Sequence, residues 1–346
     1  MILTIIPKYM RNKAIKRIVL IFIGLTGLIL QSVAQQNIQF TQYVFNALSV
    51  NPAYAGYKEA WYLQATQRMQ WIGLAGAPRT SQVSIDGVTD NAAKKTGLGL
   101  QLTIDELGAQ SATSLYVNYA YRLQINNDDT RRLCFGLAAG VTQYGIDGTI
   151  LEPVNEDDPA LTSDYKYNYI PDIRFGVYYN CPKWYIGLSI LDMLSGEKSN
   201  SIFNWDIDST QNIMRKRHSY LIAGTIFDLS KDIKFRPGIL IKSDFKGPVS
   251  WDLNALFIFE NHFLVGGSYR TAAPSLKMNL AEEPSLSKRN SVSGIVQFHV
   301  TESLSIGYSY DCTISKLNSV ENGTHELTLG WTFNRKYQRV LSPRFF

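Results

Sequence analysis

The histidines, serines and acidic residues are the side chains of this sequence that could do chemistry. The four histidines stand alone, and none has a metal-ligand spacing such as His-Glu-x-x-His. No Gly-x-Ser-x-Gly motif marks a nucleophilic serine. The sequence therefore predicts no catalytic centre, no bound metal and no cofactor, and the protein is interpreted as not being an enzyme. The histidines are His218, His262, His299 and His325.

Two charged stretches and the cysteines are open to other interpretations. The acidic stretch 152–158 could bind calcium, but it lacks the ligand order of an EF-hand loop and also fits a solvated loop. The basic stretch 215–218 could contact lipopolysaccharide phosphate, or it could be an ordinary charged loop end. The cysteines, Cys134, Cys181 and Cys312, are odd in number and widely spaced, so no disulfide framework is expected.

Residues 1–34 resemble a targeting segment. Five basic residues precede an apolar run at 18–30, and Ser32 and Ala34 are small residues at a cleavage-site spacing. This pattern predicts a cleaved secretory signal peptide. A membrane-anchoring helix is the alternative, but the run is shorter than the roughly 20 residues that span a bilayer. Outside this segment 29 basic residues face 29 acidic ones, so nucleic acid is not expected as a partner.

The rest of the chain is dominated by segments of about ten residues in which apolar and small or polar side chains alternate. In "SLSIGYSY" at 303–310, for example, one face is apolar and the other carries serines and a glycine. The pattern predicts fourteen strands with one apolar face each. Their expected ranges are 60–70, 80–88, 97–105, 111–123, 131–145, 171–180, 183–191, 217–228, 232–243, 249–259, 262–271, 290–300, 303–312 and 324–334.

The connections between these strands alternate in length. Tight turns near 181–182, 229–231, 260–261 and 301–302 alternate with long polar loops at 146–170, 192–216, 272–289 and 313–323. Short turns at one rim and long loops at the other are typical of an outer-membrane barrel, and an even strand number places both termini at the periplasmic rim. Pro237 lies inside the ninth expected strand, where it would cost a ladder hydrogen bond unless a bulge accommodates it.

Two all-β architectures fit this alternation. One is a transmembrane antiparallel β-barrel of about 14 strands, and the other is a large secreted sandwich or propeller. Aromatic residues at strand ends, strand lengths near ten and small or charged side chains on the second face favour the barrel. A bilayer permits no open sheet edge, so the sheet is expected to close.

Two stretches carry a family resemblance: "QFTQYVFNALSVNPAYAG" at 39–56 and "RMQWIGLAGAPRTSQVSIDG" at 68–87. They resemble the opening of the PorP/SprF family of Bacteroidota outer-membrane proteins. The resemblance implies a part in type IX secretion, with secretion machinery and secreted surface proteins such as gliding or adhesin filaments as partners. The residues taken as a partner-binding or structural motif are Tyr43, Phe45, Asn46, Asn51, Pro52, Tyr54, Gly56, Arg68, Trp71 and Pro78.

The expected organisation is a signal peptide at 1–34, a periplasmic or plug segment at 35–59, a barrel at 60–334 and a periplasmic tail at 335–346. Asn51, Pro52 and Ala53 form a restrained turn. The segment that contains them is a structural lead-in under one interpretation and a plug or docking element under another. Two rival functions remain: a passive or ligand-selective channel, and a barrel hydrolase with clustered Ser, His and Asp side chains at one rim.

Overall fold

The computed structural model describes the chain in eight stretches. They are residues 38–90, 93–151, 165–195, 216–245, 249–260, 262–273, 291–314 and 319–333. The signal peptide expected at 1–34 and the tail expected at 335–346 lie outside the described residues.

Within these stretches, fifteen strands and three short 3-10 helices form, and every strand pairing is antiparallel. The helices are η2 (Ala47–Ser49), η3 (Pro52–Tyr54) and η4 (Gly148–Ile150). The strands are β1 (Tyr62–Met69), β2 (Arg79–Val88), β3 (Thr96–Leu107), β4 (Gln110–Gln124), β5 (Arg132–Asp147), β6 (Tyr165–Asn180), β7 (Trp184–Leu191), β8 (His218–Thr225), β9 (Phe227–Asp228), β10 (Ile233–Ser243), β11 (Val249–Phe259), β12 (Phe263–Ala273), β13 (Ser291–His299), β14 (Leu304–Thr313) and β15 (Thr324–Thr332).

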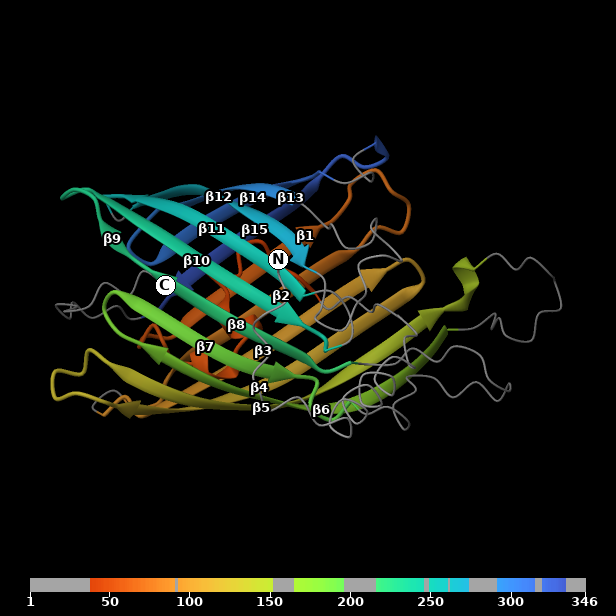
Figure 1. Cartoon of the computed structure of the whole chain (residues 1–346). Helices are drawn as coiled ribbons and strands as arrows, with labels where there is room; N and C mark the ends of the chain where they lie inside the picture. The colour runs from red at the N-terminus through yellow and green to blue at the C-terminus, as the bar shows by residue number, and fades with distance from the viewer. Residues whose placement is uncertain are drawn as a thin grey trace, which may run out of the picture. The chain divides into compact units, whose positions relative to one another are not determined.

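The strands form a meander that closes when β15 pairs with β1 (Figure 1). Because β9 continues the line of β8 beside β10, the ring is a closed 14-stranded antiparallel barrel. The predicted all-β barrel and its strand number are confirmed. Closure gives each of the fourteen strands of the ring a partner on each side, so the sheet has no open edge.

Pro237 interrupts one ladder of β10 without the bulge that the sequence suggested. On one side Pro237 pairs with Ala255 of β11. On the other side the pairing stops after Gly238–Gly224 and resumes at Phe235–Phe227 in the same register. The ninth predicted strand therefore forms without a bulge, because the ladder merely skips the positions opposite a residue that has no N–H to donate.

The connections between strands lie at the two ends of the barrel. We name the end at which β1 leads into β2 and β14 leads into β15 the long-loop rim. We name the end at which β6 leads into β7 and β13 leads into β14 the short-turn rim. The connection 70–78, which follows β1, lies at the long-loop rim with 314–323, because Ile72 N–H donates to the Gly323 carbonyl at 2.9 Å. The turn between β3 and β4 lies there too, since Gly108 N–H donates to the Gly76 carbonyl at 2.9 Å. The expectation that this rim carries longer connections than the other fails at that two-residue turn.

The largest difference from the expected strand ranges is in β6. β6 begins at Tyr165 rather than at 171, and it pairs with β5 along its whole length. Pro171 pairs with Val141 of β5, while the ladder to β7 begins only at Phe175. The proline therefore lies where the other edge of β6 has no ladder to β7, which is a position that strands tolerate. The connection between β5 and β6 is correspondingly shorter than expected.

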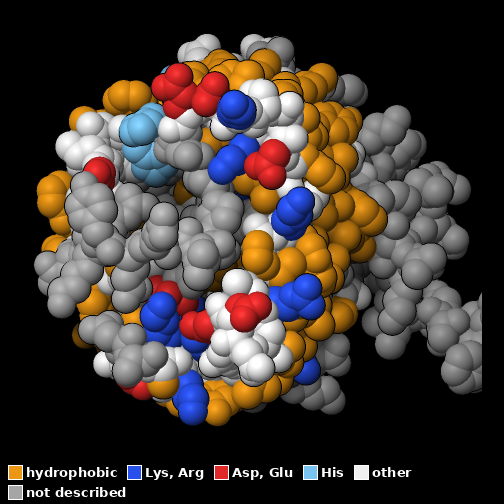
Figure 2. Space-filling model, turned by 90° about the vertical axis from the view of Figure 1, so that its left-hand side faces the viewer, with side chains coloured by type: hydrophobic (Ala, Val, Ile, Leu, Met, Phe, Trp, Pro, Cys, Tyr) orange, Lys and Arg blue, Asp and Glu red, His pale blue; other side chains and the backbone are white. Residues whose placement is uncertain are grey.

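The barrel is apolar outside and polar inside. In β14, Ile306, Tyr308 and Tyr310 are exposed on the outer wall, whereas Ser305 and Ser309 are buried in the lumen. Figure 2 views the short-turn rim and shows hydrophobic side chains covering the outer wall, with charged side chains gathered at the end of the barrel. This arrangement suits a wall that faces lipid. Among the described residues, no helix is both long and apolar enough to cross a bilayer.

Candidate functional site inside the barrel

Residues 38–57, which we name the inner segment, lie inside the barrel rather than beneath it. Figure 1 shows this red-to-orange segment running within the ring of strands. From Phe40 to Tyr57 nearly every residue is buried, and Thr41 and Ala55 have no exposed surface. The inner segment contacts β2, β6, β11 and β15 through hydrogen bonds. Its side chains therefore fill the space that the polar inner wall encloses.

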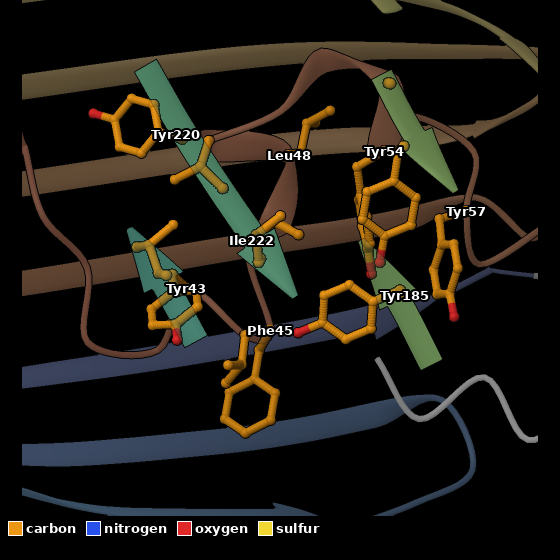
Figure 3. Close-up of a cluster of buried hydrophobic side chains, with 14 of the residues drawn as sticks. Tyr43, Phe45, Leu48, Tyr54, Tyr57, Tyr185, Tyr220 and Ile222 are labelled. Carbon is orange, nitrogen blue, oxygen red and sulfur yellow. The ribbon is translucent and has the colours of Figure 1, made fainter. Parts of the chain in front are cut away.

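Aromatic side chains form the core of this packing. The Tyr54 ring stacks on Tyr57 with centroids 4.8 Å apart and meets Tyr178 of β6 edge-on at 5.7 Å. Tyr178 in turn stacks on Tyr185 of β7 at 5.6 Å. Figure 3 shows the rings of Tyr54, Tyr57 and Tyr185 in one cluster with Phe45 and Leu48 of the inner segment. Such pairs contribute about 0.5–1.5 kcal/mol each beyond the burial of their area.

Tyr43 combines apolar burial with a polar contact. Its hydroxyl donates to the Asp252 carbonyl of β11 at 3.4 Å and accepts a hydrogen bond from the Asn254 side chain. Both contacts tie the start of the inner segment to β11.

The turn predicted at Asn51 and Pro52 forms η3. The Asn51 side chain accepts from Ala53 N–H at 2.9 Å and donates to the Val177 carbonyl of β6 at 3.1 Å. Pro52 occupies the first helical position, where its missing N–H costs nothing. Asn51 thus caps the helix and ties it to the wall with the same side chain.

Gly56 lies next to the end of the buried stretch. Its φ of +75° is a left-handed conformation that favours glycine, and its N–H donates to the Asp86 carboxylate of β2 at 2.8 Å. A Cβ at this position would also come within 3.0 Å of the Gly97 Cα in β3. Two independent constraints therefore require glycine here.

Glycines of the inner wall make room for the inner segment. A Cβ added at Gly97 or Gly136 would lie closer than 3.0 Å to its backbone, at Ala55 and Ala53 respectively. The same holds for Gly176 against the Asn51 side chain and for Gly307 against Gln42. The wall and the inner segment are therefore complementary in shape at four strands.

We expect Gly136→Ala to destabilise the folded barrel by about 1–3 kcal/mol, because the new methyl group overpacks against the backbone of Pro52 and Ala53. Urea unfolding of the purified protein in detergent micelles measures the change. Gly294→Ala is the matched control, because a Cβ at Gly294 of β13 meets no atom within 4 Å. Equal effects of the two substitutions would contradict the close fit at Gly136.

One end of the inner segment is held by a buried charge cluster, which we name the anchor and which comprises Arg68, Asp311 and Glu326. Arg68 of β1 contacts Asp311 of β14 and Glu326 of β15, each at 2.8 Å, and all three side chains are almost completely buried. The Glu326 carboxylate accepts from the N–H groups of Thr41 and Gln42, both at 2.8 Å. The Thr41 hydroxyl donates to Asp311 at 2.6 Å.

The other end is held at the short-turn rim. Glu59 follows the inner segment, and its carboxylate contacts Lys94 at 2.6 Å and Arg122 of β4 at 3.5 Å. Arg132 of β5 adds a hydrogen bond to the Lys94 carbonyl at 2.8 Å. The inner segment is thus held at its start by hydrogen bonds to the anchor and just beyond its other end by the ion pairs of Glu59.

The ten residues of the predicted motif occupy two places. Seven of them, from Tyr43 to Gly56, lie in the inner segment, and Arg68 reaches the same segment from β1. Trp71 and Pro78 lie instead in the connection at the long-loop rim. There Trp71 N–H donates to the Thr324 hydroxyl at 3.2 Å, and the Pro78 carbonyl accepts from Gln70 N–H at 2.9 Å. Asn46 donates to Gln82 of β2 at 2.7 Å.

The sequence did not identify Thr41, Asp311 or Glu326 as site residues. Glu326 was recognisable only as a charge on the polar face of its strand, which a wet lumen would explain equally well. Thr41 and its anchor partner Glu326 are 285 residues apart in the chain, and strand periodicity contains no signal for that partnership. The wall glycines were similarly visible only as small residues.

Groups with catalytic potential are sparse in the described part of the chain. His218 of β8 lies 3.4 Å from the Asp192 carboxylate at the long-loop rim. The nearby Ser195 hydroxyl donates to the Asp192 carbonyl at 2.5 Å. A serine nucleophile would need its hydroxyl hydrogen-bonded to the histidine side chain, whereas the Ser195 hydroxyl binds a backbone carbonyl. Among the described residues, no group of three or more His, Cys, Asp or Glu side chains is arranged to hold a metal ion.

Comparison with solved structures shows a shared barrel fold. The CymD monoaromatic hydrocarbon channel aligns over 83% of this chain and 92% of its own, with a TM-score of 0.51 and 13% identity. The Ralstonia pickettii toluene transporter TbuX aligns over 82% and 92% of the two chains, with a TM-score of 0.46 and 11% identity. Omp33 of Acinetobacter baumannii aligns over 80% and 99%, with a TM-score of 0.43 and 7% identity.

Comparison with protein families is more specific. No curated protein sequence matches the chain. The family model described as type IX secretion system membrane protein PorP/SprF matches residues 32–331, which include the inner segment and almost all of the barrel. The predicted resemblance is thereby confirmed, and the chain belongs to the PorP/SprF family of type IX secretion system membrane proteins.

Proposed function

We propose that this protein is an outer-membrane accessory component of type IX secretion that assists the export or surface attachment of partner proteins, such as gliding or adhesin filaments. Family membership supports the link to secretion. The observation that carries the rest of the proposal is the burial of residues 40–57 in the lumen, which leaves the rims and loops as the surfaces on which partners can act. The long-loop rim faces the cell exterior, and the short-turn rim faces the periplasm.

In this proposal the inner segment is a plug. Its core is apolar and aromatic, and its backbone fits the wall glycines. Hydrogen bonds to the anchor hold its start, and the ion pair of Glu59 with Lys94 lies just beyond its other end. A passive channel would need a water-filled path through the same space. The likeness to CymD supports the barrel fold and does not assign a transported molecule to this chain.

Deleting the gene tests the proposed function. We expect one or a few surface proteins to disappear from the cell surface, and either to accumulate inside or to be shed into the medium. Quantitative mass spectrometry of surface-labelled, periplasmic and medium fractions measures this. The wild-type gene should restore the pattern, and a variant with residues 276–288 replaced by a short Gly-Ser linker tests the external loops.

A control variant carries an altered short turn, Asn127→Ser with Asp128→Ser, at the opposite rim. Unchanged surface and medium proteomes in the deletion strain, together with reduced uptake of small solutes, would overturn the accessory role and favour the channel. A defect restored equally by the loop-shortened gene would place partner recognition away from the loop 274–290.

A further inference from the structure

The inner segment runs through the barrel in one direction, and its contacts show which. At its start, Thr41 and Gln42 bind the anchor. Arg68 is the last residue but one of β1, Asp311 is the last but two of β14, and Glu326 is the third residue of β15. All three positions are strand ends that adjoin the connections 70–78 and 314–323. The inner segment therefore begins at the long-loop rim.

Further along, the contacts move steadily toward the other end. Asn46 binds Gln82, which lies within β2, and Gly56 binds Asp86 near the end of the same strand. Glu59 then reaches Lys94 and Arg122 at the short-turn rim. Finally the Trp61 carbonyl accepts from Phe333 N–H at 2.8 Å, beside the start of β1 and the end of β15. Residues 41–61 thus cross the lumen once, from one rim to the other.

Burial at the start of the inner segment agrees with this direction. Phe40 and Thr41 are buried, whereas Ile38 and Gln39 are half-buried. The lumen below them is filled by the rest of the inner segment, and the anchor occupies the wall beside Thr41. We infer that the inner segment enters the lumen from the long-loop rim, so that Ile38 is accessible from the same side of the membrane as the long loops.

The strand count alone would place the start of the inner segment and the start of β1 at the same rim, whereas this inference places them at opposite rims. An even number of strands places the start of β1 and the end of β15 at one rim, and the contact between Trp61 and Phe333 shows that they are neighbours there. The strand count describes the ends of the barrel and not the end of the chain. A segment that folds back through the lumen carries its own N-terminal end to the opposite rim. That Ile38 lies at the long-loop rim is independent of the proposed function. That this rim faces the cell exterior rests on the orientation given under the proposed function.

Cysteine labelling on cells tests the inference. Ile38→Cys is compared with Gln110→Cys, at the tight turn of the long-loop rim, and with Asn127→Cys, at a short turn. Each variant is expressed in the native host, treated with a membrane-impermeant maleimide before and after permeabilisation, and then purified. The wild-type chain gives the background from its three native cysteines. In parallel, an epitope tag inserted directly before Ile38 is detected with antibody on intact cells.

We expect Ile38→Cys to follow Gln110→Cys, with labelling on intact cells at least fivefold above the wild-type background, while Asn127→Cys is labelled only after permeabilisation. The tag should be detected on intact cells. The inference is overturned if Ile38→Cys follows Asn127→Cys, or if neither the cysteine nor the tag is detected from the side on which Gln110→Cys is labelled. If Gln110→Cys itself requires permeabilisation, the proposed orientation fails, while the pairing of Ile38 with Gln110 still decides the inference.

Discussion

Replacing Arg68 with methionine lowers the free energy of unfolding by about 3–5 kcal/mol, because it leaves two buried carboxylates without their cation. Asp311 and Glu326 would both lose a contact of 2.8 Å inside the lumen. The same carboxylates hold the N–H groups of Thr41 and Gln42, so the start of the inner segment should loosen as well. Urea unfolding of the purified protein in detergent micelles, followed by tryptophan fluorescence, measures the loss.

Arg79→Met is the matched control, since Arg79 is exposed at the start of β2, and substitutions at exposed sites usually change stability by less than about 0.5 kcal/mol. The loss in unfolding free energy of Arg68→Lys should lie between those of Arg68→Met and Arg79→Met. Lysine keeps the positive charge but lacks the guanidinium group, whose separate N–H donors bind two carboxylates at once. If Arg68→Met unfolds at the same urea concentration as Arg79→Met, the anchor contributes nothing to stability.

Truncating Tyr54 to alanine should cost about 3–5 kcal/mol, as is usual for a large buried aromatic side chain. Tyr54 is only 3% exposed and lies against both Tyr57 and Tyr178, so its removal leaves a cavity between the inner segment and the wall. The same urea titration detects the loss. Tyr54→Phe should retain most of the stability, because the ring contacts remain.

Tyr121→Ala provides the comparison for Tyr54→Ala. Tyr121 is 43% exposed on the outer wall, where detergent or lipid tails fill the space that its ring leaves. We therefore expect a much smaller change than at Tyr54. A larger loss at Tyr121 than at Tyr54 would show that the stability of the barrel depends on its outer surface rather than on the packing of the inner segment.

Most of the barrel could be predicted from the sequence because its physical signal is local. A strand between lipid and a polar lumen must alternate every second residue, so β14 could be recognised from "SLSIGYSY" alone. The start of β6 could not, because Tyr165, Tyr167 and Tyr169 extend beyond the part of the strand that pairs with β7. The turn at Gly108 is shorter than the connection 106–110 that the expected strand ranges left, because Glu106 and Gln110 are polar, like the residues of a longer loop.

The interior was less predictable, for a different reason. The aromatic and apolar side chains around Tyr43 indicate burial, but not whether the burial lies inside the barrel or against a partner. That answer depends on wall glycines such as Gly136, and on charges such as Glu326, which come close only when the sheet closes. The resemblance to the PorP/SprF family identified residues 39–56 as a stretch typical of that family, but it did not indicate where this stretch packs.

The central claim is that the inner segment blocks the lumen of the barrel. Single-channel recording of the purified wild-type protein in planar lipid bilayers tests this claim. A variant with residues 38–57 excised, refolded and verified by its heat-modifiable migration, provides the open reference. We expect inserted wild-type barrels to show no stable conductance steps, and the excised variant to show steps typical of an open pore. Stable wild-type steps equal to those of the excised variant would contradict the account.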